Sequence, residues 1–257
     1  MKKWMSIIIF LVSISIFGKQ TMEQLRTAAE KGDTKAQYQL GISYEFGKDV
    51  KKNYIEAVKW YRKAAEQGVS LAQAALGDCY RAGAGVKKDY AEMVKWYYKA
   101  AENGDARAQF LLGQCYSFGQ GVSSDNKTAI KWYRKASEQG YAIAQFVFGV
   151  CYDKGIGIEK DYNEAIKWYR KAAKQGYARA QFNLGIFYAT KQGNYAKAGE
   201  WYKKAAKQGY VKAQFMLGFC YLNGIGLKKD EEEGKKWFQK AAKQGSKPAK
   251  EMLSNLK

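Results

Sequence analysis

One 36-residue segment recurs along nearly the whole chain, and it constrains the fold more than any other feature of the sequence. Five copies have this length, 33–68, 69–104, 105–140, 141–176 and 210–245, and a sixth, 177–209, has 33 residues. Self-similarity at a fixed period of about 20–50 residues is typical of proteins whose repeats stack in a row and bury a core between neighbours. We therefore expect a row of stacked repeats instead of one closed core.

Each repeat is expected to contain two helices. In the fourth copy the second helix places Trp168 and Tyr169 on one side of the helical wheel and its lysines on the other, as in an amphipathic helix. Asp161, with Glu164 three residues later, predicts a capping box at the start of this helix. Gly176 predicts its end, because glycine readily adopts the left-handed conformation that terminates helices.

A glycine in the middle of each first helix predicts a close helix crossing. In the fourth copy this helix covers about 142–153, and Gly149 would cost roughly 1 kcal/mol relative to alanine. The equivalent glycine is present in all six copies: Gly41, Gly77, Gly113, Gly149, Gly185 and Gly218. The 33-residue copy lacks three residues between Tyr188 and Ala198, so we expect a shorter turn there.

The repeat resembles a known family. The pattern A-x-x-x-LG-x-x-Y-x-x-G-x-GV-x-KD-Y-x-x-A-x-KWY-x-KAA-x-QG is similar to the Sel1-like repeat, a relative of the tetratricopeptide repeat, and it covers roughly 21–257. The resemblance implies an all-α fold, a right-handed α/α superhelical solenoid of six helix-turn-helix repeats with terminal capping helices. It also implies a scaffold or adaptor for other proteins, an inference from the family and not from any single residue.

The two ends of the chain predict capping helices and an export signal. Residues 21–31 read as a lone second helix, and 246–257 as a final helix with Ser246 at its N-cap and Pro248 in its first turn. Residues 1–18 resemble a secretory signal peptide, which leaves 19–257 as one solenoid domain and predicts a periplasmic or secreted protein. The apolar run is too short to cross a bilayer, although an uncleaved anchor is the alternative.

Four cysteines occupy one equivalent position in different repeats: Cys79, Cys115, Cys151 and Cys220. Packed helices lie about 8–10 Å apart, which exceeds the Cα separation of about 7 Å that a disulfide tolerates. We therefore expect four buried free thiols and no disulfide. The secreted cysteine-rich branch of the family pairs two cysteines within each repeat, but the second position here is alanine (Ala65, Ala101 and Ala173), so the resemblance fails at this feature.

The sequence offers little for catalysis, and we predict no catalytic, cofactor-binding or metal-binding residue. The chain has no histidine, which excludes Ser-His-Asp and Cys-His catalysis and histidine metal sites. The segment from Ser124 to Lys127 contains the SxxK and SDN strings of penicillin-recognising enzymes, but they overlap at a helix start and no KTG follows. Some cysteine-rich relatives have a penicillin-binding or β-lactamase label, so a cell-envelope enzyme of that type is an alternative hypothesis.

The charge of the chain is strongly positive. The formal net charge is +20, and residues 141–257 contribute more of it (+12) than residues 19–140 (+6). A basic surface would attract an anionic partner such as an acidic protein or an envelope polymer, while a solvated lysine face is the simpler interpretation. The tryptophans and tyrosines lie on the core side of the helices, so they form no base-stacking surface, and we predict no nucleic-acid partner.

The copies differ most along one arc of the first helix, at residues 35, 39, 42 and 46 and their equivalents, which we call the variable arc. The resemblance implies that first helices line a concave groove, and apolar groups rimmed by basic ones suggest protein binding. The alternative is that the superhelix closes tightly and buries this arc. We expect a monomer that binds a partly acidic protein segment there. The candidate residues are Arg107, Leu111, Gln114, Phe118, Ile143, Val147, Val150, Lys154, Arg179, Ile186, Lys212, Met216, Phe219 and Asn223, with Asn183 and Thr190 on the same arc.

Overall fold

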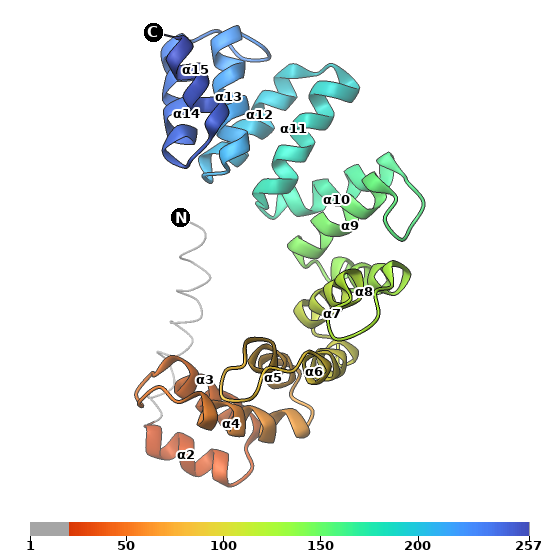
Figure 1. Ribbon diagram of the computed structural model, residues 1–257, viewed down its shortest axis with the longest axis vertical. Coiled ribbons are helices and arrows are strands. Elements are labelled where there is room, and N and C mark those ends of the chain that lie inside the picture. Colours follow the sequence, from red (N-terminus) through yellow and green to blue (C-terminus); the bar gives the residue numbers. More distant parts are fainter. Residues whose placement is uncertain (1–20, 257) are drawn as a thin grey trace. The chain divides into compact units, whose positions relative to one another are not determined.

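The computed structural model describes residues 21–256, which contain fourteen helices and no strand (Figure 1). The helices are α2 (Met22–Glu30), α3 (Thr34–Phe46), α4 (Tyr54–Glu66), α5 (Ser70–Ala82), α6 (Tyr90–Glu102), α7 (Ala106–Phe118), α8 (Asn126–Glu138), α9 (Ala142–Lys154), α10 (Tyr162–Lys174), α11 (Ala178–Gln192), α12 (Tyr195–Lys207), α13 (Val211–Asn223), α14 (Glu231–Lys243) and α15 (Lys247–Asn255). The all-α, repeated architecture is as predicted. The expected signal peptide, 1–18, lies outside the described residues.

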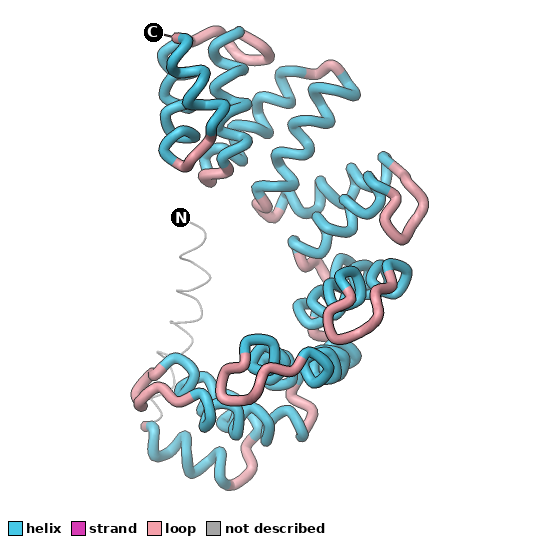
Figure 2. The backbone as a smooth tube through the Cα atoms, viewed as in Figure 1, coloured by secondary structure: helices cyan, strands magenta, loops and turns pink. Residues whose placement is uncertain are grey.

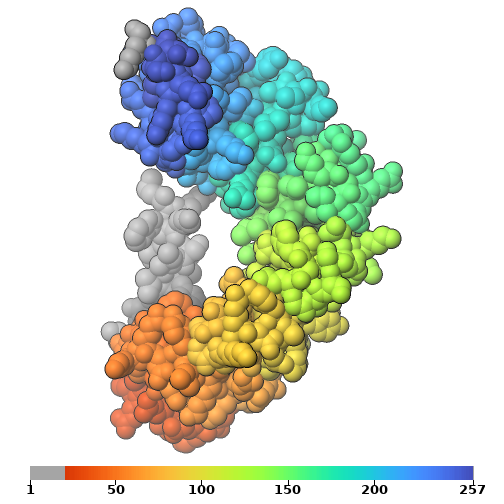
Figure 3. All heavy atoms as spheres, viewed as in Figure 1, coloured from red at the N-terminus to blue at the C-terminus, as the bar shows by residue number. Residues whose placement is uncertain are grey.

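The chain divides into two compact units, one up to Ser124 and one from Asp125 onward. Unit 1 contains α2 to α7, and unit 2 contains α8 to α15. Within each unit, consecutive helices pack as neighbours and short loops join their ends (Figure 2). Neighbouring repeats of each unit are in direct contact in the space-filling view (Figure 3).

The mid-helix glycine is the point at which the two helices of one repeat touch. A Cβ added to Gly149 would lie 2.8 Å from two ring atoms of Tyr169, and one added to Gly77 would lie 2.6 Å from the ring of Tyr97. Real Cβ atoms do not approach other atoms so closely, so only glycine fits here. The predicted crossing is confirmed, and the crossing element is the second helix of the same repeat.

The second helices terminate as predicted, whereas the prediction for their first residues is only partly right. Gly176 adopts a φ of +89°, and the N–H groups of Gly176 and Tyr177 donate to the carbonyls of Ala173 and Ala172, as in a Schellman motif. At the start, the Asp161 side chain accepts from the N–H groups of residues 163 and 164.

The predicted reciprocal half of this capping box is wrong. The Asp161 N–H donates to the carbonyl of Tyr152 at 3.0 Å instead, which closes the loop, and the Glu164 carboxylate pairs with Lys167. The N-cap residues Asn53, Asp89 and Asp230 close their loops in the same way. A capping box with both bonds forms at Thr21 and Gln24, at the start of α2.

The short repeat shortens its turn, as expected, and lengthens its first helix. Helix α11 has 15 residues, against 13 in the other first helices, and it ends at Gly193 with a φ of +61°. Asn194 then caps α12 through the N–H of Lys197. The change is therefore confined to the loop end of the hairpin.

The core of each unit consists of the small and aromatic residues of the second helices and the apolar side of the first helices. Tyr169, Ala172 and Leu184 belong to one buried cluster in unit 2, and Tyr202, Leu217 and Trp237 to the next. The tryptophan faces are covered by lysines one turn later, as where Lys171 Nζ lies 3.8 Å from the centre of the Trp168 ring. These rings are part of the core, as predicted.

A buried glutamine connects each repeat to the preceding one, a feature that the sequence analysis missed. The Gln181 amide donates to the Ala173 carbonyl at 3.2 Å, and its oxygen accepts from the Gln208 amide at 2.8 Å. The same donation to a preceding second helix recurs at Gln37, Gln73, Gln109, Gln145 and Gln214. Each glutamine adds a hydrogen bond between repeats to a carbonyl in the last turn of the preceding helix, such as that of Ala173, which also accepts from the Gly176 N–H.

Lone helices cover the apolar faces at the two chain ends, as predicted. Leu25 and Ala29 of α2 pack against Leu40 of α3 in unit 1. In unit 2, Ala249 of α15 packs against Phe238, and Ser246 caps the helix through the N–H of Ala249. Without these helices the terminal repeats would expose the faces that all other repeats bury.

Replacing Gly149 with alanine is expected to destabilise the protein, although alanine is the better helix former. The new methyl group would overlap the Tyr169 ring and cost about 1–3 kcal/mol of unfolding free energy. Urea unfolding followed by circular dichroism measures this change. As a control, Ala91→Gly at an exposed position in the first turn of α6 should cost less than about 1 kcal/mol, because the full propensity difference applies only inside a helix. A gain in stability for Gly149→Ala would contradict the close contact.

Removing one buried glutamine is expected to weaken the contact between two repeats. Gln181→Ala removes the hydrogen bonds to the Ala173 carbonyl and from the Gln208 amide, and the loss of each should cost about 0.5–1.5 kcal/mol of unfolding free energy. The matched variant Gln39→Ala alters an exposed glutamine of α3 and should change stability by less than about 0.5 kcal/mol. Equal effects of the two variants in thermal unfolding would refute this role.

Candidate functional site

The variable arc lies on the first helices, α7 in unit 1 and α9, α11 and α13 in unit 2. None of the fourteen predicted residues is buried. Those classed as exposed are Arg107, Phe118, Lys154, Arg179, Ile186, Lys212, Phe219 and Asn223, and those half-buried are Leu111, Gln114, Ile143, Val147, Val150 and Met216. Their role in binding stays a prediction.

In unit 1 the arc presents single large apolar side chains. Phe118, at the end of α7, is 75% exposed, and Phe46, at the same place on α3, is 71% exposed. Leu71, at the start of α5, is also exposed. Covering an exposed apolar side chain of this size with another molecule would be favourable, because its apolar surface would leave water. These positions are therefore candidates for contact with a partner.

In unit 2 the apolar part of the arc is anchored in the core. Val150 packs against the cluster that contains Tyr169, and Met216 against the cluster that contains Tyr202. Ile186 and Phe219, one repeat apart, are the exposed members. Because Val150 and Met216 pack on the core, the apolar side chains of the arc in unit 2 are held in place.

Basic groups stand on the same arc. Lys154 lies 3.6 Å from the carboxylate of Asp153. Arg179 and Lys212, in contrast, have no carboxylate within ion-pair distance among residues 21–256. The arc of unit 2 therefore combines apolar side chains with two cations that lack an internal counter-ion.

A carboxylate network occupies the arc of unit 1. The Tyr97 hydroxyl donates to Asp78 Oδ1 at 2.6 Å, and the Arg107 guanidinium contacts Asp78 Oδ2 at 2.6 Å. Arg81 contacts the same carboxylate at 3.1 Å. Burial raises the pKa of Tyr97, and its hydrogen bond to Asp78 raises that pKa further. In the preceding repeat the Tyr61 hydroxyl donates to Glu45, and burial followed by this bond raises its pKa as well.

The equivalent tyrosine of unit 2 has Val150 at the place of Asp78, and the acid near its hydroxyl is Asp153 instead. Tyr169 is 3% exposed, and its hydroxyl is buried without a hydrogen-bond partner. Burial is the main cause that raises its pKa, and the nearby Asn183 amide opposes this effect while Asp153 adds to it. The sequence analysis missed both tyrosine sites, although aligning the repeats places Asp78 against Val150 and could have revealed the difference.

The four cysteines are buried free thiols in the structure. Burial raises the pKa of Cys79 to about 12 and that of Cys115, Cys151 and Cys220 to about 11, from an ordinary value of 9.0. A thiol that keeps its proton is a poor nucleophile and a poor metal ligand. These side chains act as small apolar groups of the core.

Other candidate sites offer little chemistry. In the described part of the chain, no three His, Cys, Asp or Glu side chains are grouped so that they could hold a metal ion. No helix of residues 21–256 has the length and apolar character needed to span a membrane. The SxxK string lies at a helix start, where Ser124 Oγ donates to the Ser117 carbonyl and Asp125 caps α8.

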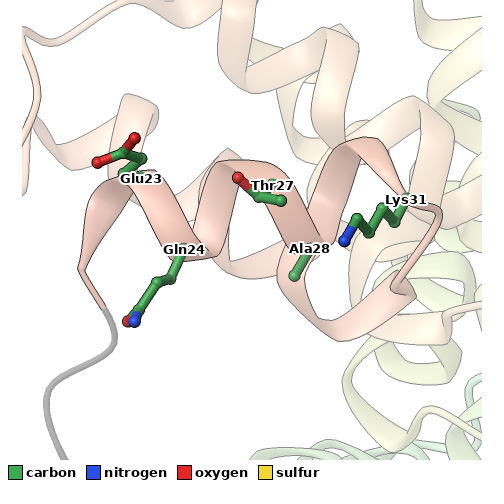
Figure 4. A pocket seen from close by; sticks show the side chains of 5 residues that line it. All are labelled: Glu23, Gln24, Thr27, Ala28 and Lys31. Atoms are coloured by element: carbon green, nitrogen blue, oxygen red, sulfur yellow. The ribbon is translucent and has the colours of Figure 1, made fainter.

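A shallow depression lies along the outer side of α2 (Figure 4). It is lined by Glu23, Gln24, Thr27 and Ala28 of α2 and by Lys31, the C-cap residue of this helix. None of these side chains is buried, so no polar group is held in place for a ligand. We assign no function to it.

Comparisons with known proteins agree with the repeat pattern. The family model for the Sel1 repeat matches 34–69, 70–105, 106–141, 142–177, 178–210 and 211–246, each one residue later than the expected boundaries. The crystal structure of a Sel1 repeat protein from Oxalobacter formigenes has a TM-score of 0.78 and 36% identity, with 90% of this chain and 94% of that chain covered.

Two further relatives come from Escherichia coli. The crystal structure of c5321, described as a protective antigen of uropathogenic strains with an SLR fold, has a TM-score of 0.87 and 39% identity. That match covers 91% of this chain and 51% of c5321, so the chain spans about half of that protein. The secretory immunoglobulin A-binding protein EsiB of strain CFT073 is 40% identical over 52 residues, which are 20% of this chain and 11% of EsiB.

The thiols are expected to react only when the protein unfolds. Titration with a chromogenic disulfide reagent at pH 8 should detect none of the four in the native state and all four in denaturant, because burial keeps them protonated and covered. Cys151→Ala, as a control, should lower the denatured count by one. Absence of reactive thiols in both states would instead indicate disulfides.

The same thiols predict a loss of stability at alkaline pH. Above about pH 9 the unfolded chain releases thiol protons that the native state retains up to about pH 11, so the unfolded state binds fewer protons and stability falls as pH rises. The fall in unfolding free energy between pH 9 and 11 should be smaller in Cys151→Ala than in the parent protein.

Proposed function

The chain belongs to the Sel1-repeat family, and from this premise we propose that it is a non-enzymatic scaffold that binds a partner protein along the variable arc. Sel1-repeat proteins generally mediate interactions between proteins. The arc is the part of the repeat that the shared packing does not dictate, so it is the surface on which one member can differ from another in its partner.

The observation that carries this proposal is the exposed apolar surface of α9, α11 and α13 in unit 2. Ile186 is 39% exposed and Phe219 37%, and Val147, Val150 and Met216 are half-buried beside them on the same arc. Aromatic, methionine and branched side chains at the centre of a surface with a polar rim are typical of protein interfaces. Burial of this surface by a partner would stabilise the complex through the hydrophobic effect.

The charges on the arc favour a partner segment with acidic as well as apolar residues. Arg179 and Lys212 lie at the starts of α11 and α13, and residues 141–257 have a net charge of +12. Complementary charges accelerate association and select among partners more than they add affinity. A partly acidic protein segment that follows the arc therefore fits both features.

We also propose that the protein acts outside the cytoplasm. The sequence predicts a signal peptide at 1–18, and EsiB, a relative by sequence, is named for binding secretory immunoglobulin A. A protein partner met in the periplasm or outside the cell is consistent with both. Crosslinking in intact cells followed by purification of this chain would identify it.

Placing two carboxylates on the apolar arc is expected to abolish partner capture without unfolding the protein. Val147→Asp combined with Phe219→Asp alters one half-buried and one exposed side chain of unit 2, so the helices should stay folded. Capture is measured by crosslinking, and helicity by circular dichroism. Gln239→Asp, on the exposed side of α14, is the matched control and should capture normally.

Two results would contradict this function. Loss of helicity in the double variant would mean that the arc belongs to the core. Capture that persists in the variant but falls steeply with added salt would mean that charge alone, and not the apolar arc, holds the partner.

A further inference from the structure

Lysines gather at the C-terminal ends of three second helices in unit 2. The last turns of α10, α12 and α14 each carry an exposed lysine at the position where α4 and α6 have Glu66 and Glu102. A second exposed lysine lies one turn earlier, over the ring of the preceding tryptophan. We call these six side chains the basic edge: Lys171, Lys174, Lys204, Lys207, Lys240 and Lys243.

Hydrogen bonds between repeats hold these last turns in a row. Gln181 donates to the Ala173 carbonyl in the last turn of α10 and accepts from Gln208, the C-cap residue of α12, at 2.8 Å. Gln214 joins α12 to α14 in the same way, with Gln244 as the donor at 2.8 Å. The basic edge is therefore one continuous feature that extends over three repeats.

No carboxylate neutralises the basic edge. Its six lysines form no ion pair with any residue between 21 and 256. From 165 to 229 the sequence has thirteen Lys or Arg residues and one acid, Glu200. A lysine in the last turn stabilises a helix through its dipole. Because α4 and α6 form with a glutamate at the same position, however, the fold itself does not require lysine there.

The first helices that begin at this edge also lack an acid. Asp105 caps α7 in unit 1, whereas Tyr177 and Tyr210 precede α11 and α13 and provide no side-chain cap. Both tyrosines are half-buried, and their rings lie 5.2 and 5.3 Å from those of Phe146 and Phe182. Tyrosine and lysine combine an apolar body with a polar tip, so both are favoured at the boundary between a membrane and water.

We propose that the basic edge rests on an anionic phospholipid surface, with its ammonium groups against the phosphates and the two tyrosines at the level of the headgroups. Clusters of four to eight basic residues on helices typically recognise such lipids. Lysines offer hydrogen-bond donors and no acceptors, which suits phosphate groups, whereas a bound peptide would also present N–H groups. The inference goes beyond the proposed function, because it places the protein at a membrane surface and leaves the variable arc to the partner.

Vesicles of stated composition provide the probe. The full chain is mixed with vesicles of phosphatidylcholine alone or with one-third phosphatidylglycerol, acetylated briefly with acetic anhydride, and analysed by mass spectrometry at each lysine. The anionic vesicles should slow acetylation of Lys174, Lys207 and Lys243 at least about fivefold, and added salt should remove this protection. Because the apolar segment 7–17 meets both kinds of vesicle, protection that is equal on the two, or absent from the edge, would overturn the proposal.

Reversing the charge of the edge tests it directly. Lys174→Glu, Lys207→Glu and Lys243→Glu together give α10, α12 and α14 the residue of α4 and α6, and should weaken binding to anionic vesicles at least about tenfold. The three changes to Gln remove charge without opposing the helix dipole, and should also weaken binding if the Glu variant unfolds in circular dichroism.

The matched control changes three exposed lysines at the loop end of the hairpins in unit 2: Lys191→Glu, Lys197→Glu and Lys228→Glu. It alters the net charge by the same amount and should weaken binding less than about threefold. Equal losses in the two Glu variants would mean that net charge, and not the basic edge, binds the vesicle.

Two further measurements separate this inference from other partners. Poly-glutamate that protects the basic edge as strongly as anionic vesicles of equal charge would mean that an acidic chain, and not a lipid surface, is recognised. Val147→Asp with Phe219→Asp should leave binding to vesicles unchanged, since neither residue belongs to the basic edge. Loss of vesicle binding in that variant would contradict two separate surfaces, so the lipid contact and the partner contact can fail independently.

Discussion

The contact between the second helix of one repeat and the first helix of the next holds each unit together. It is mostly apolar, but a glutamine amide lies within it, as where Gln181 joins the Ala173 carbonyl to the Gln208 side chain. An apolar surface alone tolerates sliding, whereas a buried amide must meet its partners at one position or lose its hydrogen bonds. The glutamines therefore fix how neighbouring helices align, and the variable arc depends on that alignment.

Much of the fold could be predicted because its causes are local and repeated. Gly149 predicted a close crossing, and the structure shows the Tyr169 ring against it. The capping box at Asp161 was half wrong because the N–H group of this residue also had a nonlocal acceptor, the Tyr152 carbonyl. The buried glutamines were missed because a glutamine is normally exposed, and only the neighbouring helix supplies the carbonyl that keeps it buried.

The candidate site could be predicted only in outline. Variation among the copies pointed to the arc, none of whose candidate residues is fully buried, and the role of the arc in binding stays a prediction. The pairing of Asp78 with Arg107 joins two different first helices, so the spacing within one repeat does not reveal it. The valine at position 150, in place of an aspartate, changes the surroundings of Tyr169, which can be recognised only once the tyrosine is known to point there.

The 33-residue repeat shows which part of the hairpin can change in length while the contacts between repeats are kept. It lacks three residues at the loop, yet the Gln181 and Gln214 amides still reach the preceding helices. The contact between neighbouring repeats therefore uses the same glutamine hydrogen bond on either side of the short repeat. The loop of the hairpin varies without affecting this contact. Gene duplication can add or delete whole copies of such a hairpin while every contact between repeats stays the same, so the number of repeats and the side chains of the variable arc can evolve separately.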